Sequence, residues 1–133
     1  GLNEGSKVVI AAAGEIKRTL SDSLPNINLP TGFSNPKLVS NGNLVLEGKG
    51  EMEDLITSLE NQNLDGIALI TLVDDSAFVS KDFANWLWVT FTRSNPANDI
   101  YGLNSSTNNK HFSCSIPIID ARIKAHHAPI LER

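Results

Sequence analysis

Apolar and polar positions form distinct blocks along the first part of the chain. Residues 7–13 are an apolar run with β-branched residues near its start, which predicts a buried strand. In residues 16–24 an apolar side chain recurs every fourth position, which predicts a helix that ends at Pro25. Residues 25–36 carry three of the six prolines and show no periodicity, so we expect a loop there.

A hairpin and a second helix are predicted next. Asn41 and Gly42 separate two short apolar runs within residues 37–46, and these residue types accept the positive φ angles of a tight turn. Acidic residues after Gly50 then indicate the first turn of a helix, where they complement the amide dipoles. The buried stripe of that helix is expected to contain Met52, Leu55, Ile56 and Leu59.

The strongest strand pattern covers residues 66–73, which are apolar at almost every position. A strand of this kind is covered on both faces, so we expect it at the centre of a sheet. A third helix is expected from about residue 80 to Arg93, and it is apolar around most of its circumference. This pattern predicts burial on more than one side, with Trp86 or Trp88 largely buried.

The last part of the chain is more polar. We expect residues 98–110 to form a loop, and residues 112–119 to form an edge strand because Pro117 lacks a backbone donor. Residues 120–133 are expected to be an extended tail. Strands that alternate with helices favour an α/β fold with a mixed or mainly parallel sheet flanked by helices, a β-hairpin and this C-terminal tail.

Length and charge narrow the classes of function. A chain of 133 residues is expected to form a single domain, with a linker or an engineered start at residues 1–6. The net charge of −4 and the scattered basic residues argue against a nucleic-acid partner. No apolar run reaches the roughly 18 to 20 residues that cross a bilayer, so we expect no transmembrane segment. The lone Cys114 fits a reducing, cytoplasmic compartment, and its neighbours favour a structural thiol over a nucleophile.

Few residues are arranged for chemistry. Asp74 and Asp75 follow the predicted central strand, at the sheet edge where ligands usually bind, and carboxylates of this kind hold Mg²⁺. The same two residues also serve as helix caps and turn formers. His126 and His127 are adjacent, so on an extended chain their side chains point to opposite sides and do not easily bind the same metal ion. The same objection holds for a site that also includes His111. Phosphate-binding glycine motifs and a serine nucleophile motif are missing, so no catalytic set is complete.

An ordered set of short motifs runs from residue 66 to residue 120. It comprises a strand ending in Val73-Asp74-Asp75, then Trp86, Thr92-Arg93, Pro96 and Asp99, and finally Ile118-Ile119-Asp120-Ala121. Arg93, Pro96 and Asp99 on their own are explained by a conventional end of a helix, with Arg93 pairing with Asp99 across the turn. Their order, however, resembles the C-terminal region of the UbiD-family (3-octaprenyl-4-hydroxybenzoate carboxy-lyase-like) decarboxylases. This chain has Ser76 and Asn95 where that family commonly has acids.

The resemblance implies a parent enzyme larger than this chain. Such a lyase uses prenylated FMN, with Mn or Mg and K ions, to decarboxylate an aromatic or α,β-unsaturated acid without oxidation. Its catalytic residues and cofactor ligands lie upstream, so the resemblance implies no catalytic, cofactor or metal residue here. The chain is expected to be an inactive C-terminal domain that serves oligomerisation and cleft closing. Its expected partners are the N-terminal cofactor-binding and middle domains of the same chain and other subunits of a homo-oligomer.

The resemblance also implies a stretch that lines the substrate cleft. The candidates follow the predicted turn, and we expect them to be exposed or disordered when the cleft is missing. They are Ile100, Tyr101, Gly102, Leu103 and Asn104. The alternative hypothesis is a free-standing α/β binding or signalling module with an acidic Mg-binding pocket at Asp74 and Asp75.

Overall fold

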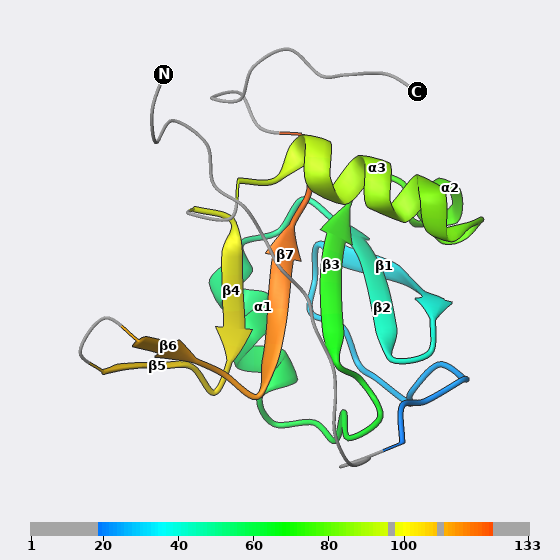
Figure 1. Ribbon diagram of the computed structural model, residues 1–133. Helices are drawn as coiled ribbons and strands as arrows, with labels where there is room; N and C mark the ends of the chain where they lie inside the picture. The colour runs from blue at the N-terminus through cyan, green and yellow to red at the C-terminus, as the bar shows by residue number, and fades with distance from the viewer. Residues whose placement is uncertain (1–18, 96–97, 109–110, 124–133) are drawn as a thin grey trace, which may run out of the picture.

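A mixed β-sheet with helices on both faces forms the centre of the computed structural model, which describes residues 19–95, 98–108 and 111–123 (Figure 1). The elements follow the chain in the order β1 Phe33–Ser40, β2 Asn43–Gly48, α1 Met52–Leu59, β3 Leu69–Val73, α2 Ser76–Ser80, α3 Phe83–Arg93, β4 Ile100–Leu103, β5 Ser106–Asn108, β6 His111–Ser113 and β7 Ile116–Asp120. The α/β fold expected from the sequence is confirmed.

Five strands pair in the order β1-β2-β3-β7-β4. The three inner strands, β2, β3 and β7, run parallel to one another, whereas β1 and β4 are antiparallel edge strands. The predicted central position of β3 is therefore confirmed. Strands β5 and β6 form a separate two-stranded hairpin that projects beside β4 (Figure 1).

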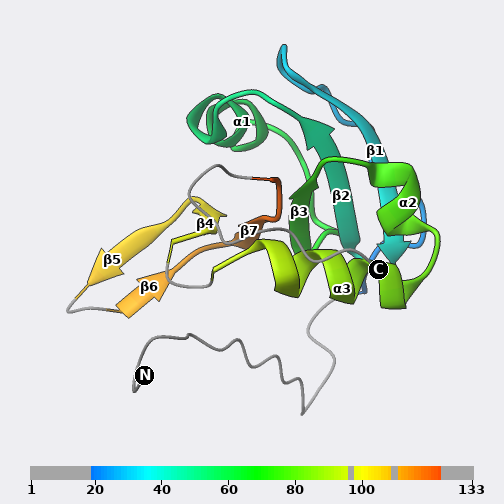
Figure 2. The same ribbon diagram turned by 90° about the horizontal axis from the view of Figure 1, so that it is seen from above.

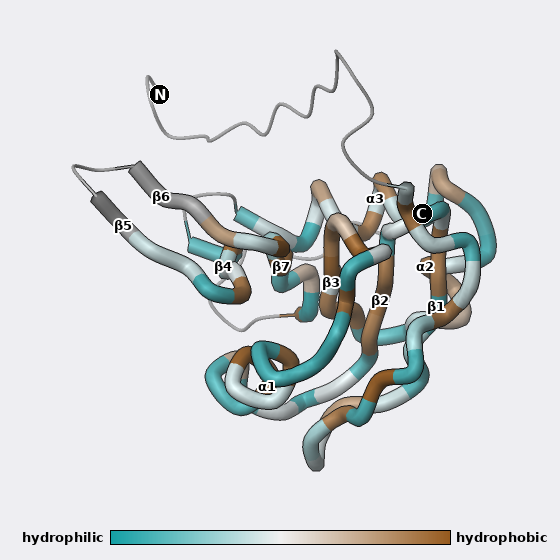
Figure 3. Tube along the Cα trace, turned by 90° about the horizontal axis from the view of Figure 1, so that it is seen from below, coloured by the Kyte–Doolittle hydropathy of each residue, from teal (hydrophilic) through white to brown (hydrophobic). Residues whose placement is uncertain are grey.

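Each face of the sheet carries its own apolar core. On one face the side chains of β2, β3 and β7 pack with α1 in a cluster that includes Leu46, Leu55 and Ile118. On the other face Val73 packs with Trp86 and other residues of α2 and α3. Figure 2 shows α1 on one side of the sheet and α3 on the other, and Figure 3 shows hydrophobic residues concentrated along β2 and β3. Inner strands covered on both faces explain the unbroken apolar runs of the sequence.

The predicted hairpin is confirmed by strands β1 and β2. Asn41 and Gly42 form its turn, and Gly42 has a φ of +74°, which glycine adopts without steric cost. A Cβ at Gly42 would lie 3.0 Å from the Leu20 side chain. The predicted second helix is confirmed as α1, on which Met52, Leu55 and Leu59 are buried.

The helix predicted from about residue 80 to Arg93 is confirmed as α3, which begins at Phe83, and a short helix that was not predicted, α2, precedes it. Asp75 caps α2 by accepting a hydrogen bond from the backbone of Phe78 at 3.1 Å. Asp82 then caps α3 by accepting one from the backbone of Asn85 at 2.8 Å. Because a capping residue has extended backbone angles, Asp82 breaks the helical path and starts a new one.

The prediction that this helix is buried on more than one side is wrong for the described residues. Phe83, Leu87 and Phe91 follow one another at every fourth position along the outer side of α3, where they are 51%, 40% and 42% exposed. Trp86 and Val89, on the other side, pack on the sheet.

Two predictions for the N-terminal part of the chain are wrong. Residues 19–24, the described part of the predicted helix over 16–24, are not helical. The backbone N–H of Ser21 instead donates to the carbonyl oxygen of Gly66, and the carbonyl oxygen of Ser21 accepts from the backbone N–H of Gly42. These two hydrogen bonds hold the segment against the end of the sheet. The predicted loop over 25–36 is also too long, because β1 already begins at Phe33. The strand predicted over residues 7–13 lies outside the described residues.

The C-terminal strands also differ from expectation. Residues 98–110 were expected to form a loop, but β4 and β5 lie there, and β4 is the edge strand. Strand β7, predicted to be an edge strand, is an inner one. Pro117 is tolerated because it lies near the start of β7, before the parallel register with β3 begins at Ile118. Of the expected tail, residues 120–123 are described and pack against the sheet edge through Arg122.

Among the described residues, no helix combines the length and the apolar character that a membrane span requires.

Candidate functional site

The parallel strands β2, β3 and β7 end at the same edge of the sheet, where α/β proteins usually bind ligands. A cleft of about 500 Å³ lies at this edge. Polar groups that follow the three strands dominate its lining. They are Gly48, Lys49, Gly50, Glu51, Asp74, Asp120, Arg122 and Ile123.

Arg122 and Asp120 form the main ion pair of this cleft. Nε of Arg122 donates to Oδ1 of Asp120 at 2.9 Å, and Nη2 donates to Oδ2 at 3.0 Å. Nη1 donates to the carbonyl oxygens of Gly48 at 3.2 Å and Gly50 at 2.8 Å. The hydrogen bonds from Arg122 to Asp120 raise the pKa of the guanidinium. Arg122 therefore ties the end of β7 to the turn between β2 and α1.

Asp74 links the end of β3 to two other segments. Its Oδ2 accepts a hydrogen bond from the backbone N–H of Ile123 at 2.9 Å and lies 3.4 Å from Nη1 of Arg93. The Arg93 and Asp74 side chains are 22% and 32% exposed, so solvent only partly screens this pair. Asp74 thus holds together the start of the tail and the end of α3.

Asp75 has a different role from its neighbour. Its carboxylate caps α2, as described above, while Asp74 contacts Arg93 and Ile123. Metal binding and helix capping were the two roles expected for Asp74 and Asp75, and Asp75 has the capping role. In the part of the chain that the structure describes, no group of three or more His, Cys, Asp or Glu side chains is arranged to hold a metal ion.

Glu47 and Ser76 connect β2 to the start of α2. Oε2 of Glu47 accepts hydrogen bonds from the backbone N–H of Ser76 at 2.8 Å and from its hydroxyl at 3.1 Å. Nδ2 of Asn35 donates to Oε1 at 2.9 Å. The bond from Asn35, followed by that from the Ser76 backbone, holds the pKa of Glu47 below its usual value. Ser76 is fully buried, so an acid at this position would place a second carboxylate beside Glu47.

Two further motif residues have structural contacts. Trp86 is 2% exposed, and its indole N–H donates to Oγ1 of Thr71 at 3.1 Å. The hydroxyl of Thr92 donates to the carbonyl oxygen of Trp88 at 2.6 Å, within α3. The predicted burial of Trp86 is thus confirmed.

Asp99 connects the turn after α3 to the sheet. This residue is 4% exposed, and its Oδ2 accepts from the backbone N–H of Asn95 at 2.7 Å. Its carbonyl oxygen accepts from the backbone N–H of Asp120 at 2.8 Å. The pairing of Arg93 with Asp99 stays a prediction, and Pro96 lies outside the described residues. The described motif residues Asp74, Arg93, Asp99 and Asp120 nevertheless meet at one edge of the sheet.

The five substrate-cleft candidates do not form an exposed loop, so that expectation is wrong. Ile100, Tyr101, Gly102 and Leu103 are β4, which pairs with β7. Leu103 is 2% exposed and belongs to the core on the α1 face, because strand pairing turns it inward.

The antiparallel direction of β4 separates the two ends of this stretch. Ile100 pairs with Ile119 near the cleft edge, whereas Leu103 pairs with Ile116 at the far end. Asn104 is exposed there, and its backbone N–H donates to Oε2 of Glu60 at 2.7 Å. Whether this stretch contacts a substrate stays a prediction.

The thiol and imidazole candidates have less support from the structure. Cys114 is half-buried, and burial raises the pKa of its thiol, which disfavours the nucleophilic thiolate. The side chain of His111 and both residues His126 and His127 lie outside the part that the structure describes.

Sequence reasoning missed the residues that organise the cleft. No role was predicted for Arg122, although an arginine two residues beyond an aspartate at a strand end can bind both oxygens of that carboxylate. No role was predicted for the glycines beside Lys49 either. An added Cβ at Gly50 would lie 2.6 Å from the Phe33 ring, so a side chain at this position would displace that ring. The role of Glu47 has no signal in the sequence, because its donors Asn35 and Ser76 are far from it along the chain.

Comparison with known proteins gives sequence relatives but no matching family model. The chain is 32% identical over 119 residues to an uncharacterized protein of Chlamydia trachomatis, covering 90% of this chain and 20% of that protein. It is 30% identical over 145 aligned positions to a Chlamydia pneumoniae protein that is named as a subunit of a 4-hydroxybenzoate decarboxylase, covering 98% of this chain and 22% of that protein. The chain thus spans about a fifth of the length of these curated relatives.

Two solved structures are also similar. An evolved dimeric form of the UbiD-class enzyme HmfF from Pelotomaculum thermopropionicum, in complex with prFMN, gives a TM-score of 0.44 at 18% identity, over 68% of this chain and 20% of that one. The vanillic acid decarboxylase of Sedimentibacter hydroxybenzoicus in its open form, with truncated ShVdcD, gives 0.45 at 15% identity, over 72% and 26%. By sequence, this chain is similar to about a fifth of a chlamydial protein that is named as part of a decarboxylase.

Proposed function

We propose that this chain is the C-terminal domain of a UbiD-like, prenylated-FMN-dependent decarboxylase, in which it serves subunit association and closure of the substrate cleft. The observation that carries the proposal is the sequence similarity to the Chlamydia pneumoniae protein named as a 4-hydroxybenzoate decarboxylase component. The parent reaction is the non-oxidative decarboxylation of an aromatic or α,β-unsaturated acid. We also propose a cytoplasmic location and a homo-oligomeric parent.

The contacts at the cleft support a structural role for the domain. Arg122 has its guanidinium hydrogen-bonded to Asp120, Gly48 and Gly50, and Asp74 is engaged by Arg93 and the Ile123 backbone. Charged groups that already bind one another are costly to recruit for a chemical step, because each loses its partner. The arrangement instead fixes the relative positions of β2, β3, β7 and α3.

The start of α2 does not fit the phosphate of a flavin cofactor. Helix N-termini usually supply the amide donors for phosphate, but the N–H of Ser76 donates to Glu47 and that of Phe78 donates to Asp75. A phosphate at this helix start would therefore meet two carboxylates. We place the prenylated FMN and its metal ions in the other domains of the parent, and we assign no catalytic step to this chain.

The substrate-lining proposal is narrower than the sequence suggested. Leu103 is a core residue and Gly102 is buried too, so we keep the lining role only for Ile100, Tyr101 and Asn104. Ile100 and Tyr101 are half-buried and Asn104 is exposed, which leaves part of their surface open to other domains.

The experiment compares the isolated chain with the complete protein that contains it. The complete protein, expressed with a supply of prenylated FMN, is expected to release CO₂ from one or more aromatic acids, beginning with 4-hydroxybenzoate. The isolated chain is expected to release none and to show no binding of FMN in calorimetry. Deletion of the domain from the complete protein is expected to abolish turnover and to alter the oligomeric state, with the flavin content retained.

A matched pair of variants sharpens the test. In the complete protein, Arg122→Lys removes the hydrogen bonds through which the guanidinium connects β7 to the turn after β2. This variant is expected to lower kcat/KM at unchanged flavin content. Lys81→Ala, at an exposed position between α2 and α3, serves as the control. CO₂ release or micromolar FMN binding by the isolated chain would contradict the non-catalytic role. Failure of the flavin-loaded complete protein to decarboxylate any acid tested would contradict the enzyme class.

A further inference from the structure

The turn between β1 and β2 consists of an asparagine followed by a glycine, Asn41 and Gly42. These two residues are the only Asn-Gly pair in the sequence. Glycine has no Cβ, so its backbone nitrogen is open to approach by the side chain of the preceding residue. Asn41 is exposed, so water reaches its side-chain amide. The turn therefore has the composition and the exposure that deamidation requires.

Deamidation is a substitution at the side-chain carbonyl carbon of asparagine. The backbone nitrogen of Gly42 gives up its proton and forms a bond to Cγ of Asn41. The bond from Cγ to Nδ2 breaks, and the amide nitrogen leaves with that proton as ammonia. Water then opens the resulting succinimide ring at one of its two carbonyl groups, which gives either aspartate or isoaspartate. Water is the only co-reactant, and nothing is oxidised or reduced.

The attacking nitrogen is held in the folded chain. The backbone N–H of Gly42 donates to the carbonyl oxygen of Ser21 at 2.9 Å. The carbonyl oxygen of Gly42 accepts from the backbone N–H groups of Ala68 at 2.8 Å and Leu69 at 3.2 Å. Because the peptide groups on both sides of Gly42 are held, its nitrogen keeps its proton and its direction. In this state it does not attack Cγ of Asn41.

The segment of residues 19–24, here called the Ser21 segment, covers the turn. The backbone N–H of Ser21 donates to the carbonyl oxygen of Gly66 at 2.8 Å. A Cβ on Gly42 would lie 3.0 Å from the side chain of Leu20, so Leu20 packs directly against this glycine. The Ser21 segment belongs to no helix or strand, and its Leu24 is 49% exposed. A segment with so few contacts opens more easily than the sheet that it covers.

We infer that Asn41 is a site of deamidation, and that opening of the Ser21 segment sets the rate. While Ser21 accepts the hydrogen bond from Gly42, the attacking nitrogen is withheld. When the segment moves away, the N–H of Gly42 is released and the reaction proceeds. This modification is independent of the proposed decarboxylase function, because it needs only the chain and water.

The two products differ in their effect on the hairpin. Aspartate keeps the length of the main chain and adds one negative charge. Isoaspartate adds a methylene to the main chain, within a two-residue turn that the pair Ser40 and Asn43 closes. A lengthened turn cannot keep the hydrogen bonds of Gly42 to both Ser21 and Ala68. We therefore expect the isoaspartate form to unfold at a lower urea concentration than the original chain.

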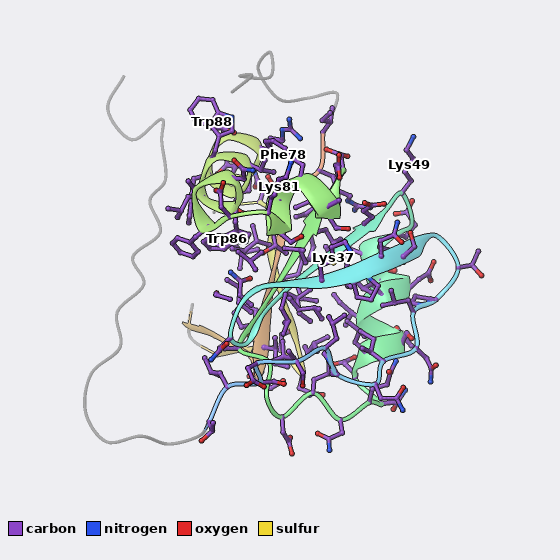
Figure 4. The ribbon with its side chains drawn as sticks, turned by 90° about the vertical axis from the view of Figure 1, so that its right-hand side faces the viewer. Lys37, Lys49, Phe78, Lys81, Trp86 and Trp88 are labelled. Atoms are coloured by element: carbon purple, nitrogen blue, oxygen red, sulfur yellow. The ribbon has the colours of Figure 1, made fainter. Side chains whose placement is uncertain are left out.

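The test is incubation of the 133-residue chain in mildly alkaline buffer, once folded and once in urea, followed by tryptic digestion and mass spectrometry. Figure 4 shows Lys37 on β1 and Lys49 beyond β2, and cleavage at these lysines releases residues 38–49 as one peptide. Water enriched in oxygen-18 marks each converted residue. Asn41 is expected to convert about tenfold or more faster in urea, because unfolding removes the hydrogen bonds around Gly42. Asn43 of the same peptide precedes a bulky leucine and is expected to stay intact.

Two variants loosen the Ser21 segment without changing the turn. Ser21→Pro removes the N–H that donates to Gly66, and Leu20→Ala removes the side chain that packs against Gly42. Each is expected to speed the conversion of Asn41 in the folded chain by about two- to tenfold. Leu24→Ala, at an exposed side chain of the same segment, is the matched control and is expected to leave the rate unchanged. Circular dichroism shows which variants fold, and the milder Leu20→Ala decides the test if Ser21→Pro does not.

Low urea concentrations separate local opening from global unfolding. Local opening exposes little surface, so the rate in the folded chain should stay nearly constant below the unfolding transition. A rate that rises steeply in this range would overturn control by the Ser21 segment, and so would equal rates for Leu20→Ala and the original chain. An Asn41 that stays intact in urea would overturn the site itself.

Discussion

Arg122 and Asp120 lie two residues apart at the end of β7, and they meet through two parallel hydrogen bonds of 2.9 and 3.0 Å. The third nitrogen of Arg122 donates to the carbonyl oxygens of Gly48, the last residue of β2, and of Gly50. One planar guanidinium thus connects two strand ends that are separated by β3 in the sheet. Both the charge and the forked geometry of arginine are needed for this arrangement.

Replacement of Arg122 by lysine tests that geometry. Lysine keeps the positive charge but presents a single ammonium, which cannot bind both oxygens of Asp120 and both carbonyls at once. We expect Arg122→Lys to lower the free energy of unfolding by about 1–2 kcal/mol in urea titrations. Lys81→Ala, at an exposed position, is expected to change it by less than about 0.5 kcal/mol. Equal unfolding midpoints for Arg122→Lys and the original chain would show that the paired hydrogen bonds of the guanidinium do not contribute to the free energy of unfolding.

Trp86 and Trp88 on α3 differ in burial, because Trp86 is 2% exposed whereas Trp88 packs only partly against the same core. Trp86→Phe removes the indole N–H that donates to Thr71, so we expect a loss of about 1–2 kcal/mol in the free energy of unfolding. Trp86→Ala also leaves a cavity, which raises the expected loss to about 3–5 kcal/mol. Trp88→Ala is expected to lower the free energy of unfolding clearly less, because Trp88 is only half-buried. Similar losses for the two alanine variants would contradict the assigned orientation of the helix.

The carboxylate of Glu47 makes stability depend on pH. Hydrogen bonds from Asn35 and Ser76 lower its pKa in the folded chain. The folded state therefore binds this proton less readily than the unfolded state, so the stabilisation is present above the unfolded pKa and is lost as pH falls through the folded pKa. We expect Glu47→Gln to be less stable than the original chain at neutral pH. The difference should shrink below about pH 4, where an ordinary glutamate protonates.

The measurement for Glu47 is a series of thermal unfolding curves from neutral to acidic pH for both proteins. The matched control is Glu53→Gln, at an exposed residue of α1, which is expected to give no such pH-dependent difference. A gap between Glu47→Gln and the original chain that widens as the solution becomes more acidic would refute the direction of the shift.

Leu103 tests the placement of β4. Because this side chain is 2% exposed in the core on the α1 face, we expect Leu103→Ala to lower the free energy of unfolding by about 2–5 kcal/mol. Asn104→Ala, at the neighbouring exposed residue, is expected to have a much smaller effect. Chemical denaturation monitored by tryptophan fluorescence measures both variants. A Leu103→Ala chain as stable as the original would place this residue on the surface, as the sequence had suggested.

Local patterns predicted the elements whose structure depends on near neighbours. The turn at Asn41 and Gly42, the stripe of α1 and the apolar run of β3 all follow from a few adjacent residues, because turn angles and helical periodicity are local properties. Local patterns failed where a distant segment supplies the hydrogen bonds. Residues 19–24 show a helical period, but the backbone of Ser21 bonds to Gly66 and Gly42 instead.

The candidate site shows the same division. The motif from Asp74 to Asp120 was visible in the sequence, and so was the position of Asp74 at a strand end. The pairing of Asp74 with Arg93, and that of Glu47 with Asn35 and Ser76, joins residues between 12 and 29 positions apart. Nothing in the local sequence specifies such partners, since they depend on which strands lie side by side.

By itself, the sequence determined an α/β domain with a central apolar strand, a hairpin, a buried tryptophan in the third helix and an ordered motif from Asp74 to Asp120. Only the tertiary structure decided that β7 is an inner strand, that Leu103 is buried and that the outer face of α3 is exposed. The physical reason is that hydrophobicity reports a preference for burial, whereas the strand order and the packing of helices determine which apolar surfaces find a partner within the chain.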